Sequence, residues 1–447
     1  MTARTLIALA FSAVPGIALA QADDLFVFEL TETGNMSNSL IVGGSTLPDL
    51  AEDLADTEGD FASFDGLQFD AMLRYAGVDG AIDINYDPSG GSMGGAVLTI
   101  NNIEGYDGPP IVLDEADGDL GDQLQDFFLK DNPDIIKDFL SAIAETSPVS
   151  ITDGNPLAST ARSANFRFNR FGLFADASPA SNQINRMFVD RVDPGLAGDA
   201  ESAEDDVPRM QLGSAMIDHG GFLSRIDFTG QTVSAGDFDG SSFDVNFSTE
   251  ARLNERVSLA FGVPIGYHTI EGADVFNIGL HVNLPINIML IEEDAKQGFS
   301  WTLTPGVSAE GVVSYDFAAG GTLYSLGVTN AFRYDYDRFT FIAAQQITIH
   351  ESTELDVDEY KIDPGIEQQI LKLGGKALYR FTDGAAVYVG GTWTDFLEDA
   401  AIDDYVTPVA GVMWQLKNGA NLSIGYEGDF GDDYDAHGGR LTFQMPF

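Results

Sequence analysis

The stretch Asp274-Val-Phe-Asn-Ile-Gly-Leu-His-Val-Asn-Leu-Pro-Ile-Asn-Ile-Met-Leu290 decides the fold. From Phe276 to Ile288 every second residue is apolar, and polar or small residues stand between them. Successive side chains of a β-strand face opposite sides, so a strand of this sequence has one apolar face and one polar face. Arg256–Ile270 and Asn421–Phe430 repeat the pattern. Such strands suit a sheet with lipid on one side and water on the other.

Length separates this pattern from that of a soluble sandwich. The runs of about 10–15 residues match the ~9–11 tilted residues that cross a bilayer as a strand. No stretch after the first twenty residues has the ~20 uninterrupted apolar residues of a spanning helix. An open sheet would leave backbone groups unpaired in lipid, so we expect a closed barrel. Counting strands back from Phe447 predicts about twelve antiparallel strands over 221–447.

The two ends of the chain agree with this prediction. Met1–Ala20 has an early cation, a short apolar run and an A-x-A close, which predicts a cleaved signal peptide over 1–20. The closing stretch places Leu441, Phe443, Met445 and Phe447 at every second position. This tail resembles the last strand of bacterial outer-membrane β-barrels, which commonly end in phenylalanine. The resemblance implies localisation in the cell outer membrane, with its lipid and the barrel-assembly machinery as partners, and makes these four residues a membrane-insertion signature.

Composition excludes several classes of function. The chain of 447 residues contains no cysteine, which excludes disulfides and thiolate chemistry. Its formal net charge of −48 argues against nucleic acid as a partner, because phosphates require a basic surface. The histidines show no metal-ligand spacing, so no metal site and no cofactor are predicted.

The connections between strands are expected to alternate in length, with tight turns on the periplasmic side and longer acidic loops outside. The expected tight turns are Asn254-Glu255, Tyr334–Asp337, Thr382–Gly384 and Lys417–Gly419. The expected acidic loops are Gly236–Ser241, Glu351–Asp363, Leu397–Asp404 and Gly431–His437. The stretch Glu292–Gln297 reads as a periplasmic turn that is longer than its neighbours.

Residues 21–192 read as an α+β extramembrane domain, and 193–220 as an acidic linker. Asn132-Pro133 predicts a helix start, because asparagine caps helices and proline suits their first turn. Asn155-Pro156 predicts a second helix that ends at Gly172 and carries Arg162, Arg167 and Arg170. We expect this arginine helix to thread an acidic barrel lumen.

The polar strand faces predict what lines that lumen. Charged and histidine side chains there could select solutes or could hold a salt-bridged plug. The candidate lumen-lining residues are Arg252, Arg256, His268, His281, Glu310, Arg333, His350, Lys372, Lys376, Arg380 and Glu427; Asp244, Glu250 and Arg440 share the same predicted face.

The segment Gly90-Gly-Ser92-Met-Gly94 spells the G-x-S-x-G motif of serine hydrolases. That motif works where a strand turns sharply into a helix, whereas the flanking residues here read as strands, which favours a glycine-rich hairpin. No catalytic residues are therefore predicted, and we expect no enzymatic activity.

An N-terminal region followed by a barrel of this size resembles an autotransporter. The resemblance rests on 222–447 and implies a barrel that anchors or translocates its own N-terminal domain, with a helix in the pore. The alternative is an outer-membrane channel or porin for small solutes, with the N-terminal region as plug or periplasmic domain. An esterase carried on a barrel is a third hypothesis, and it would require Ser92.

Overall fold

The computed structural model describes residues 24–174 and 222–446, with short interruptions at 48, 51–53, 55–58, 92–94, 119, 121–122, 124–126, 128–130, 152, 255, 295–296, 318, 354, 358–359, 363, 383 and 417–419. The predicted signal peptide (1–20), the predicted linker (193–220), Ser92 and Phe447 lie outside the described residues.

The N-terminal domain is built on a six-stranded sheet in the order β2-β1-β3-β4-β5-β6. Its strands are β1 (Phe26–Glu32), β2 (Ser39–Gly44), β3 (Phe69–Tyr75), β4 (Val78–Asp87), β5 (Val97–Ile103) and β6 (Ile111–Asp114). In β3, Phe69, Ala71, Leu73 and Tyr75 are buried on one face, as a period of two requires. β4 and β5 pair antiparallel, so strands flank the G-x-S-x-G segment on both sides.

Helix α4 (Pro133–Thr146) and the short η1 (Gly59–Phe64) contribute buried residues to the same apolar cluster as this sheet, whereas the short η2 (Glu115–Asp117) has no buried residue. Helix α4 begins directly after Asn132, with proline in its first turn, as the sequence predicts. Phe139, Leu140 and Ile143 are buried in the same apolar cluster as the sheet residues. The helix is therefore part of the core of the domain.

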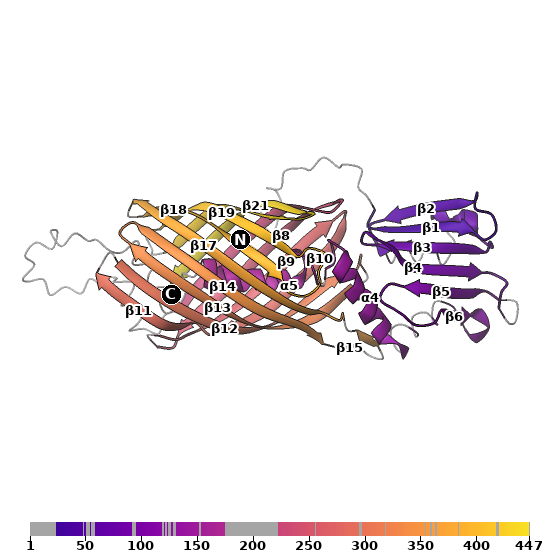
Figure 1. Ribbon diagram of the computed structural model, residues 1–447, viewed down its shortest axis with the longest axis horizontal. Coiled ribbons are helices and arrows are strands. Elements are labelled where there is room, and N and C mark those ends of the chain that lie inside the picture. Colours follow the sequence, from indigo (N-terminus) through magenta and orange to yellow (C-terminus); the bar gives the residue numbers. More distant parts are fainter. Residues whose placement is uncertain are drawn as a thin grey trace, which may run out of the picture.

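Twelve antiparallel strands form a closed barrel among the described residues, as predicted (Figure 1). They are β7 (Phe222–Ala235), β8 (Phe238–Arg252), β9 (Ser258–Ile270), β10 (Ala273–Asn283) continued by β11 (Ile286–Asp294), β12 (Gln297–Ser314), β13 (Ala319–Tyr336), β14 (Phe339–Thr353), β17 (Glu367–Thr382), β18 (Ala385–Phe396), β19 (Asp404–Gln415), β20 (Asn421–Gly431) and β21 (Tyr434–Pro446). β21 pairs with β7 and β10 pairs with both β9 and β12, so the described strands close into a ring.

The stretch that decides the fold is interrupted once, at Leu284-Pro285. Proline has no N–H to donate to a strand ladder, which ends β10 there and starts β11 at Ile286. Both strands pair with β12, and the Leu284 amide still donates to the Pro305 carbonyl at 2.9 Å. The two pieces therefore act as one strand of the barrel wall.

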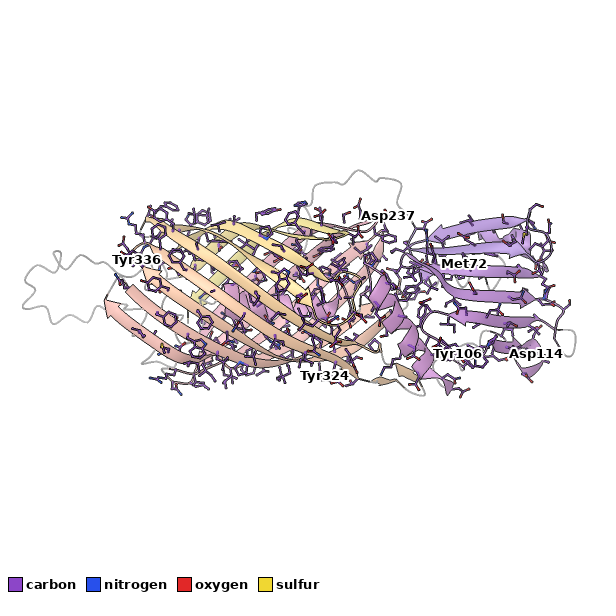
Figure 2. All side chains as sticks on the ribbon, viewed as in Figure 1. Met72, Tyr106, Asp114, Asp237, Tyr324 and Tyr336 are labelled. Carbon is purple, nitrogen blue, oxygen red and sulfur yellow. The ribbon has the colours of Figure 1, made fainter. Side chains whose placement is uncertain are left out.

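The outer wall is apolar and the inner wall polar. On β10, Phe276, Ile278 and Leu280 are each more than half exposed on the outside, whereas Asn277 and His281 are buried inside. Figure 2 shows side chains standing outward along the whole barrel, with Tyr336 and Tyr324 toward opposite ends. An apolar exterior around a polar interior is the pattern of a barrel in lipid. Among the described helices, none is long and apolar enough to cross a membrane.

The barrel has two distinct ends, which we name by what lies there. The terminal end is where β7 begins and β21 ends, and the domain end is where β7 finishes at Ala235. The N-terminal sheet and α4 sit over the domain end (Figure 1). A buried cluster joins the two parts, because it contains Phe26 and Tyr75 of the domain together with Phe238 and Phe317 of the barrel.

Some expected connections differ in the structure. At Gly236–Ser241 and Gly431–His437 we expected long loops, but β7–β8 and β20–β21 are tight hairpins whose registers close at Ala235↔Phe238 and Gly431↔Tyr434. Barrel strands can extend beyond the bilayer, so the acidic residues of these two stretches lie in strand ends and in the tight turns between them. Of the four expected acidic loops, Glu351–Asp363, which carries the small hairpin β15 (Leu355–Val357) and β16 (Tyr360–Ile362), and Leu397–Asp404 contain long connections. The turn at Glu292–Gln297 is short, because β11 pairs with β12 up to Asp294↔Gln297.

Candidate functional site: a helix inside the barrel lumen

The lumen contains the arginine helix. Helix α5 (Ser159–Phe168) continues as a π-helical turn, η4 (Asn169–Leu173), and both lie within the barrel (Figure 1). The helix starts at Ser159 rather than at the predicted Asn155-Pro156, because the Asn155 side chain instead accepts a hydrogen bond from the Leu157 amide at 2.8 Å. The segment lies inside the barrel although the sequence analysis assigned it to the domain over 21–192.

The segment runs from one barrel end to the other. At the domain end the Gly154 carbonyl accepts a hydrogen bond from the Ile402 amide, in the β18–β19 connection, at 3.2 Å. Toward the terminal end the Phe174 carbonyl accepts one from Arg225 Nη1, near the start of β7, at 3.2 Å. The chain therefore leaves the domain, crosses the lumen, and arrives where the first barrel strand begins.

Two of the three helix arginines form ion pairs with carboxylates of β8. Arg162 pairs with Asp244, and its Nη1 also lies 3.4 Å from Ser242 Oγ. Arg170 Nη2 lies 3.3 Å from Glu250 Oε2, and its Nε donates to Ser248 Oγ at 3.0 Å. Buried charges require such partners, so β8 fixes the depth and rotation of the helix.

Arg167 points to the opposite wall. Its Nη2 donates to Ser325 Oγ at 3.2 Å, and Ser325 and Ser308 are joined by a 2.5 Å hydroxyl contact. Ser308 donates to Glu310 at 3.0 Å, and the same carboxylate lies 2.8 Å from Nε2 of His281. This chain of polar contacts links the helix to β10, β12 and β13.

A third contact joins the helix to β17 and β19. Lys372 Nζ donates to Asn165 Oδ1 and to Thr394 Oγ1, each at 2.5 Å. The Tyr405 hydroxyl lies 3.4 Å from the same Asn165 oxygen. One helix amide thus receives hydrogen bonds from two wall side chains.

The last residue of the segment, Phe174, sits among cations. Lys376 Nζ lies 3.9 Å from the centre of its ring, and the guanidinium carbons of Arg440 and Arg225 lie 5.0 Å and 5.9 Å from it. Tyr388 meets the ring edge to face at 5.6 Å. Cations over an aromatic face are attracted by its quadrupole. The cations around Phe174 therefore hold the C-terminal end of the lumen helix.

Glycines of the wall make room for the helix. A side chain at Gly262 would overlap the Phe166 ring, and one at Gly327 would overlap the Arg167 guanidinium. At Gly374 a Cβ would stand 3.0 Å from Phe168 Cζ. The inner wall is shaped to this helix and not only to water.

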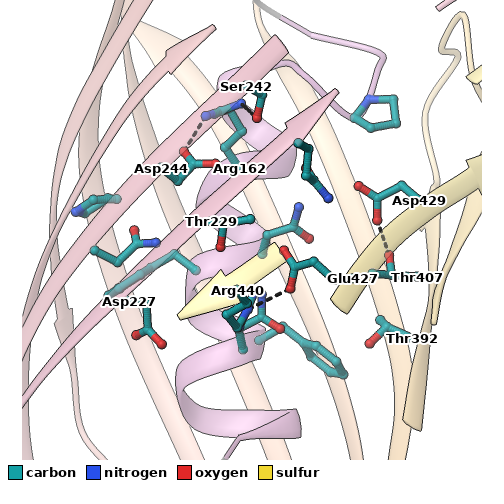
Figure 3. Close-up of a pocket in the computed structure, with 18 of the residues that line it drawn as sticks. Arg162, Asp227, Thr229, Ser242, Asp244, Thr392, Thr407, Glu427, Asp429 and Arg440 are labelled. Carbon is teal, nitrogen blue, oxygen red and sulfur yellow. Dashed lines mark hydrogen bonds and ion pairs between the residues drawn. The ribbon is translucent and has the colours of Figure 1, made fainter. Parts of the chain in front are cut away.

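A charged cavity remains beside the helix (Figure 3). The cavity has a volume of about 70 Å³ and lies between the helix and the wall. Its charged lining residues are Arg162, Arg170, Asp227, Asp244, Lys372, Glu427, Asp429 and Arg440. Figure 3 shows Arg440 paired with Glu427, whose Nε–Oε2 distance is 2.7 Å, and Thr407 hydrogen-bonded to Asp429.

Most candidate lumen-lining residues from the sequence are buried on the inner side of the wall. These are His268, His281, Glu310, Arg333, His350, Lys372, Lys376 and Glu427. Arg252 and Arg380 are half-buried near the terminal end. Arg256 does not line the lumen, because it lies exposed in the β8–β9 turn, where its amide donates to the Asn254 side chain.

The structure also places residues that the sequence analysis missed or left without a role. Arg225 forms a pair of contacts with Asp227 at 2.7–2.8 Å, and both are buried near Phe174. The alternation of β7 could have indicated Arg225 and Asp227, but nothing in the sequence indicated that Phe174 would sit among cations. In the predicted insertion signature, Leu441 is exposed on the outer wall and Phe443 and Met445 are half-buried, alternating with buried Thr442 and Gln444.

One titratable group stands where the chain passes into the lumen. Asp153 is buried, and this burial raises the pKa of its carboxyl to about 7 against the opposing effect of a hydrogen bond from the Gly154 amide at 2.9 Å. The carboxyl is therefore half-protonated near neutral pH.

Comparisons with solved structures return membrane barrels. The translocator domain of the autotransporter NalP from Neisseria meningitidis is 13% identical with a TM-score of 0.37, covering 53% of this chain and 92% of its own. The β-domain of the Bordetella autotransporter BrkA is 12% identical with a TM-score of 0.36, covering 51% and 99%. An outer membrane channel from Pseudomonas putida F1 is 11% identical with a TM-score of 0.37, covering 51% and 96%. No protein-family model and no characterised protein sequence matches the chain.

The assignment rests on the barrel itself. Its twelve described strands close into a ring, its outer wall is apolar, and its inner wall is polar and charged. These are the properties that let a sheet stand in lipid. The chain is an outer-membrane β-barrel protein that carries an additional N-terminal domain and encloses one of its own helices.

Proposed function

We propose that the protein is an autotransporter-type surface anchor, in which the barrel holds its own N-terminal domain outside the cell. The path of the chain carries the proposal. Gly154 lies at the domain end, Phe174 lies near the terminal end, and β7 starts at that same terminal end. A domain on one side of the membrane is thereby connected through the pore to a barrel whose first and last strands start and finish on the other.

The orientation follows from the connections. In outer-membrane barrels the longer loops are extracellular and the turns on the periplasmic side are short. The longest connection between the described barrel strands, from Thr353 to Glu367, lies at the domain end. We therefore place the domain end outside and the terminal end in the periplasm.

The helix would then act as the plug that remains after the chain has passed. Its contacts with β8, β12, β13 and β17 hold it against the wall by charged and polar groups. An anchor requires that the displayed domain stays attached and that the pore stays closed. Both requirements are met by a segment that is continuous with the domain and paired with the wall.

The absence of native cysteine allows a direct test. Met36 is 90% exposed in the domain and Leu253 is 59% exposed in a turn at the terminal end. In intact cells a membrane-impermeant maleimide should label Met36→Cys and should leave Leu253→Cys unlabelled until the outer membrane is permeabilised. The reverse labelling pattern would put the domain in the periplasm and would exclude surface display.

A channel for small solutes is the second candidate, because a charged cavity accompanies the helix along the lumen (Figure 3). Opposed charges such as Asp227 and Arg440 are typical of solute-selective pores. This function predicts steady single-channel conductance of the full-length protein in planar bilayers. A silent bilayer with correctly inserted protein would exclude it.

A further inference from the structure

The turn between β12 and β13 places a barrel residue in the core of the N-terminal domain. Phe317 is 1% exposed, whereas Tyr315, two residues earlier in the same turn, is 67% exposed. The Phe317 ring meets Phe26 of β1 edge to face at 5.5 Å and Tyr75 of β3 at 6.5 Å. A residue in a barrel turn becomes buried to this degree only because the domain covers it.

The hydroxyl of Tyr75 is satisfied by the same turn. It donates a hydrogen bond to the Phe317 carbonyl at 2.7 Å, and burial raises the pKa of the phenol. The Tyr75 ring also meets Phe26 and Phe139 of α4, each at 5.2 Å. Tyr75 is thus the point at which β1, β3, α4 and the barrel meet. Without the turn, the hydroxyl would lose this partner while buried, or the ring would become exposed.

Other connections at the domain end contribute to the same surface. The Asp316 carbonyl accepts a hydrogen bond from the Leu47 amide at 2.9 Å, and the Asp316 carboxylate accepts one from the Asp274 amide at 2.6 Å. Gly77, in the tight β3–β4 turn at φ +86°, lies against Phe238 at the tip of β8, where a Cβ would stand 2.9 Å from the ring. The core of the domain is therefore continuous with the mouth of the barrel.

We infer that the barrel mouth, through Phe317, serves as the folding template of the N-terminal domain. The aromatic core of the domain includes a side chain that the barrel supplies, because Phe26 and Tyr75 pack against Phe317 and Phe139 packs against Tyr75. Stable folding of the domain then begins when it reaches the mouth. Under the proposed surface display, this order also keeps the domain unfolded until it has passed the lumen.

The experiment compares two variants of one turn in the purified full-length protein in detergent. Phe317→Ala should increase the rate at which protease cuts the domain by about a hundredfold. Loss of a buried aromatic ring raises the population of the unfolded domain, which the protease cuts, by a factor of about that size. Tyr315→Ala removes an exposed ring from the same turn and should leave the cutting rate unchanged. The heat-dependent gel shift of the barrel should be the same in both variants.

Wild-type protease resistance of the domain in Phe317→Ala, with the barrel folded, would overturn the inference. If Phe317→Ala barrels fail to form, Tyr75→Phe decides the question, because it changes only the domain and removes the hydrogen bond to the turn. A cutting rate equal to that of the wild type in Tyr75→Phe would then count against the template. These assays do not depend on membrane orientation, so their failure is distinguishable from failure of surface display, which cysteine labelling tests.

Discussion

The guanidinium of Arg170 on the lumen helix lies 3.3 Å from the Glu250 carboxylate on β8, and the side chains of both are less than 5% exposed. Two formal charges are thus buried together at the interface between the helix and the wall. Breaking such a pair leaves one charge uncompensated, which is usually more costly than never having the pair.

Arg170→Glu should therefore release the helix from the wall. The loss is expected to be about 3–5 kcal/mol of docking free energy, as for other broken buried pairs. Single-channel recordings of the purified protein should show conductance that the wild type lacks. The exchange Arg170→Glu with Glu250→Arg restores opposite charges and should return the recording toward the closed state. Equal conductance in the single and the exchanged variant would show that the pair does not hold the helix.

Phe174 allows packing and cation–π attraction to be separated. Phe174→Leu keeps most of the apolar volume but removes the face on which Lys376, Arg440 and Arg225 lie, and should cost about 0.5–2 kcal/mol. Phe174→Ala should cost about 3–5 kcal/mol because it also leaves a cavity. The conductance of the protein, or the rate of hydrogen exchange of residues 159–173, should increase from the wild type to the Leu variant and again to the Ala variant. Identical behaviour of the Leu variant and the wild type would leave packing as the only contribution.

The fit of the helix to wall glycines gives a steric test. Gly262→Val places a side chain where the Phe166 ring lies and should cost about 1–3 kcal/mol through overpacking. Gly311→Val is the matched control, since the nearest atom to a Cβ there is 4.0 Å away. Thermal unfolding should distinguish the two variants. A control as destabilised as Gly262→Val would point to strand propensity and not to the helix.

Asp153 predicts a pH dependence. Its folded-state pKa of about 7 lies above the ordinary value of 3.8, so the folded protein binds a proton that the unfolded chain releases. Stability from the neutral carboxyl is present below about pH 4 and is lost as pH rises through 7, by at most about 4 kcal/mol. The melting temperature should therefore fall between pH 5 and pH 8, and Asp153→Asn should flatten that decline. An unchanged slope in the variant would assign the pH dependence to other groups.

The barrel could be predicted from sequence because its wall obeys a period of two over long runs, as between Phe276 and Ile288. The threading helix could be predicted because three arginines on a short helix in an acidic chain require buried partners. The lengths of the acidic connections could not be predicted from the sequence. Residues such as Asp237 and Asp433 occupy tight turns at the ends of long strands, and an acidic tight turn has the same composition as an acidic loop.

The seating of the domain lay beyond sequence reasoning. Tyr75 and Phe317 are separated by 242 positions, and neither residue differs in its local pattern from an ordinary strand or turn aromatic. The cluster of cations around Phe174 was hidden for the same reason, since these cations come from β7, β17 and β21. Contacts between distant segments depend on the closed ring, which brings those strands together only after it forms.

The shortness of α5 has a mechanical consequence. Ten residues are too few to form a stable helix in water, so the segment becomes helical only where the barrel wall supplies partners. Winding residues 159–173 from an extended chain into helix shortens them by roughly 25–30 Å. This shortening would draw the N-terminal domain toward the barrel until it contacts the domain end.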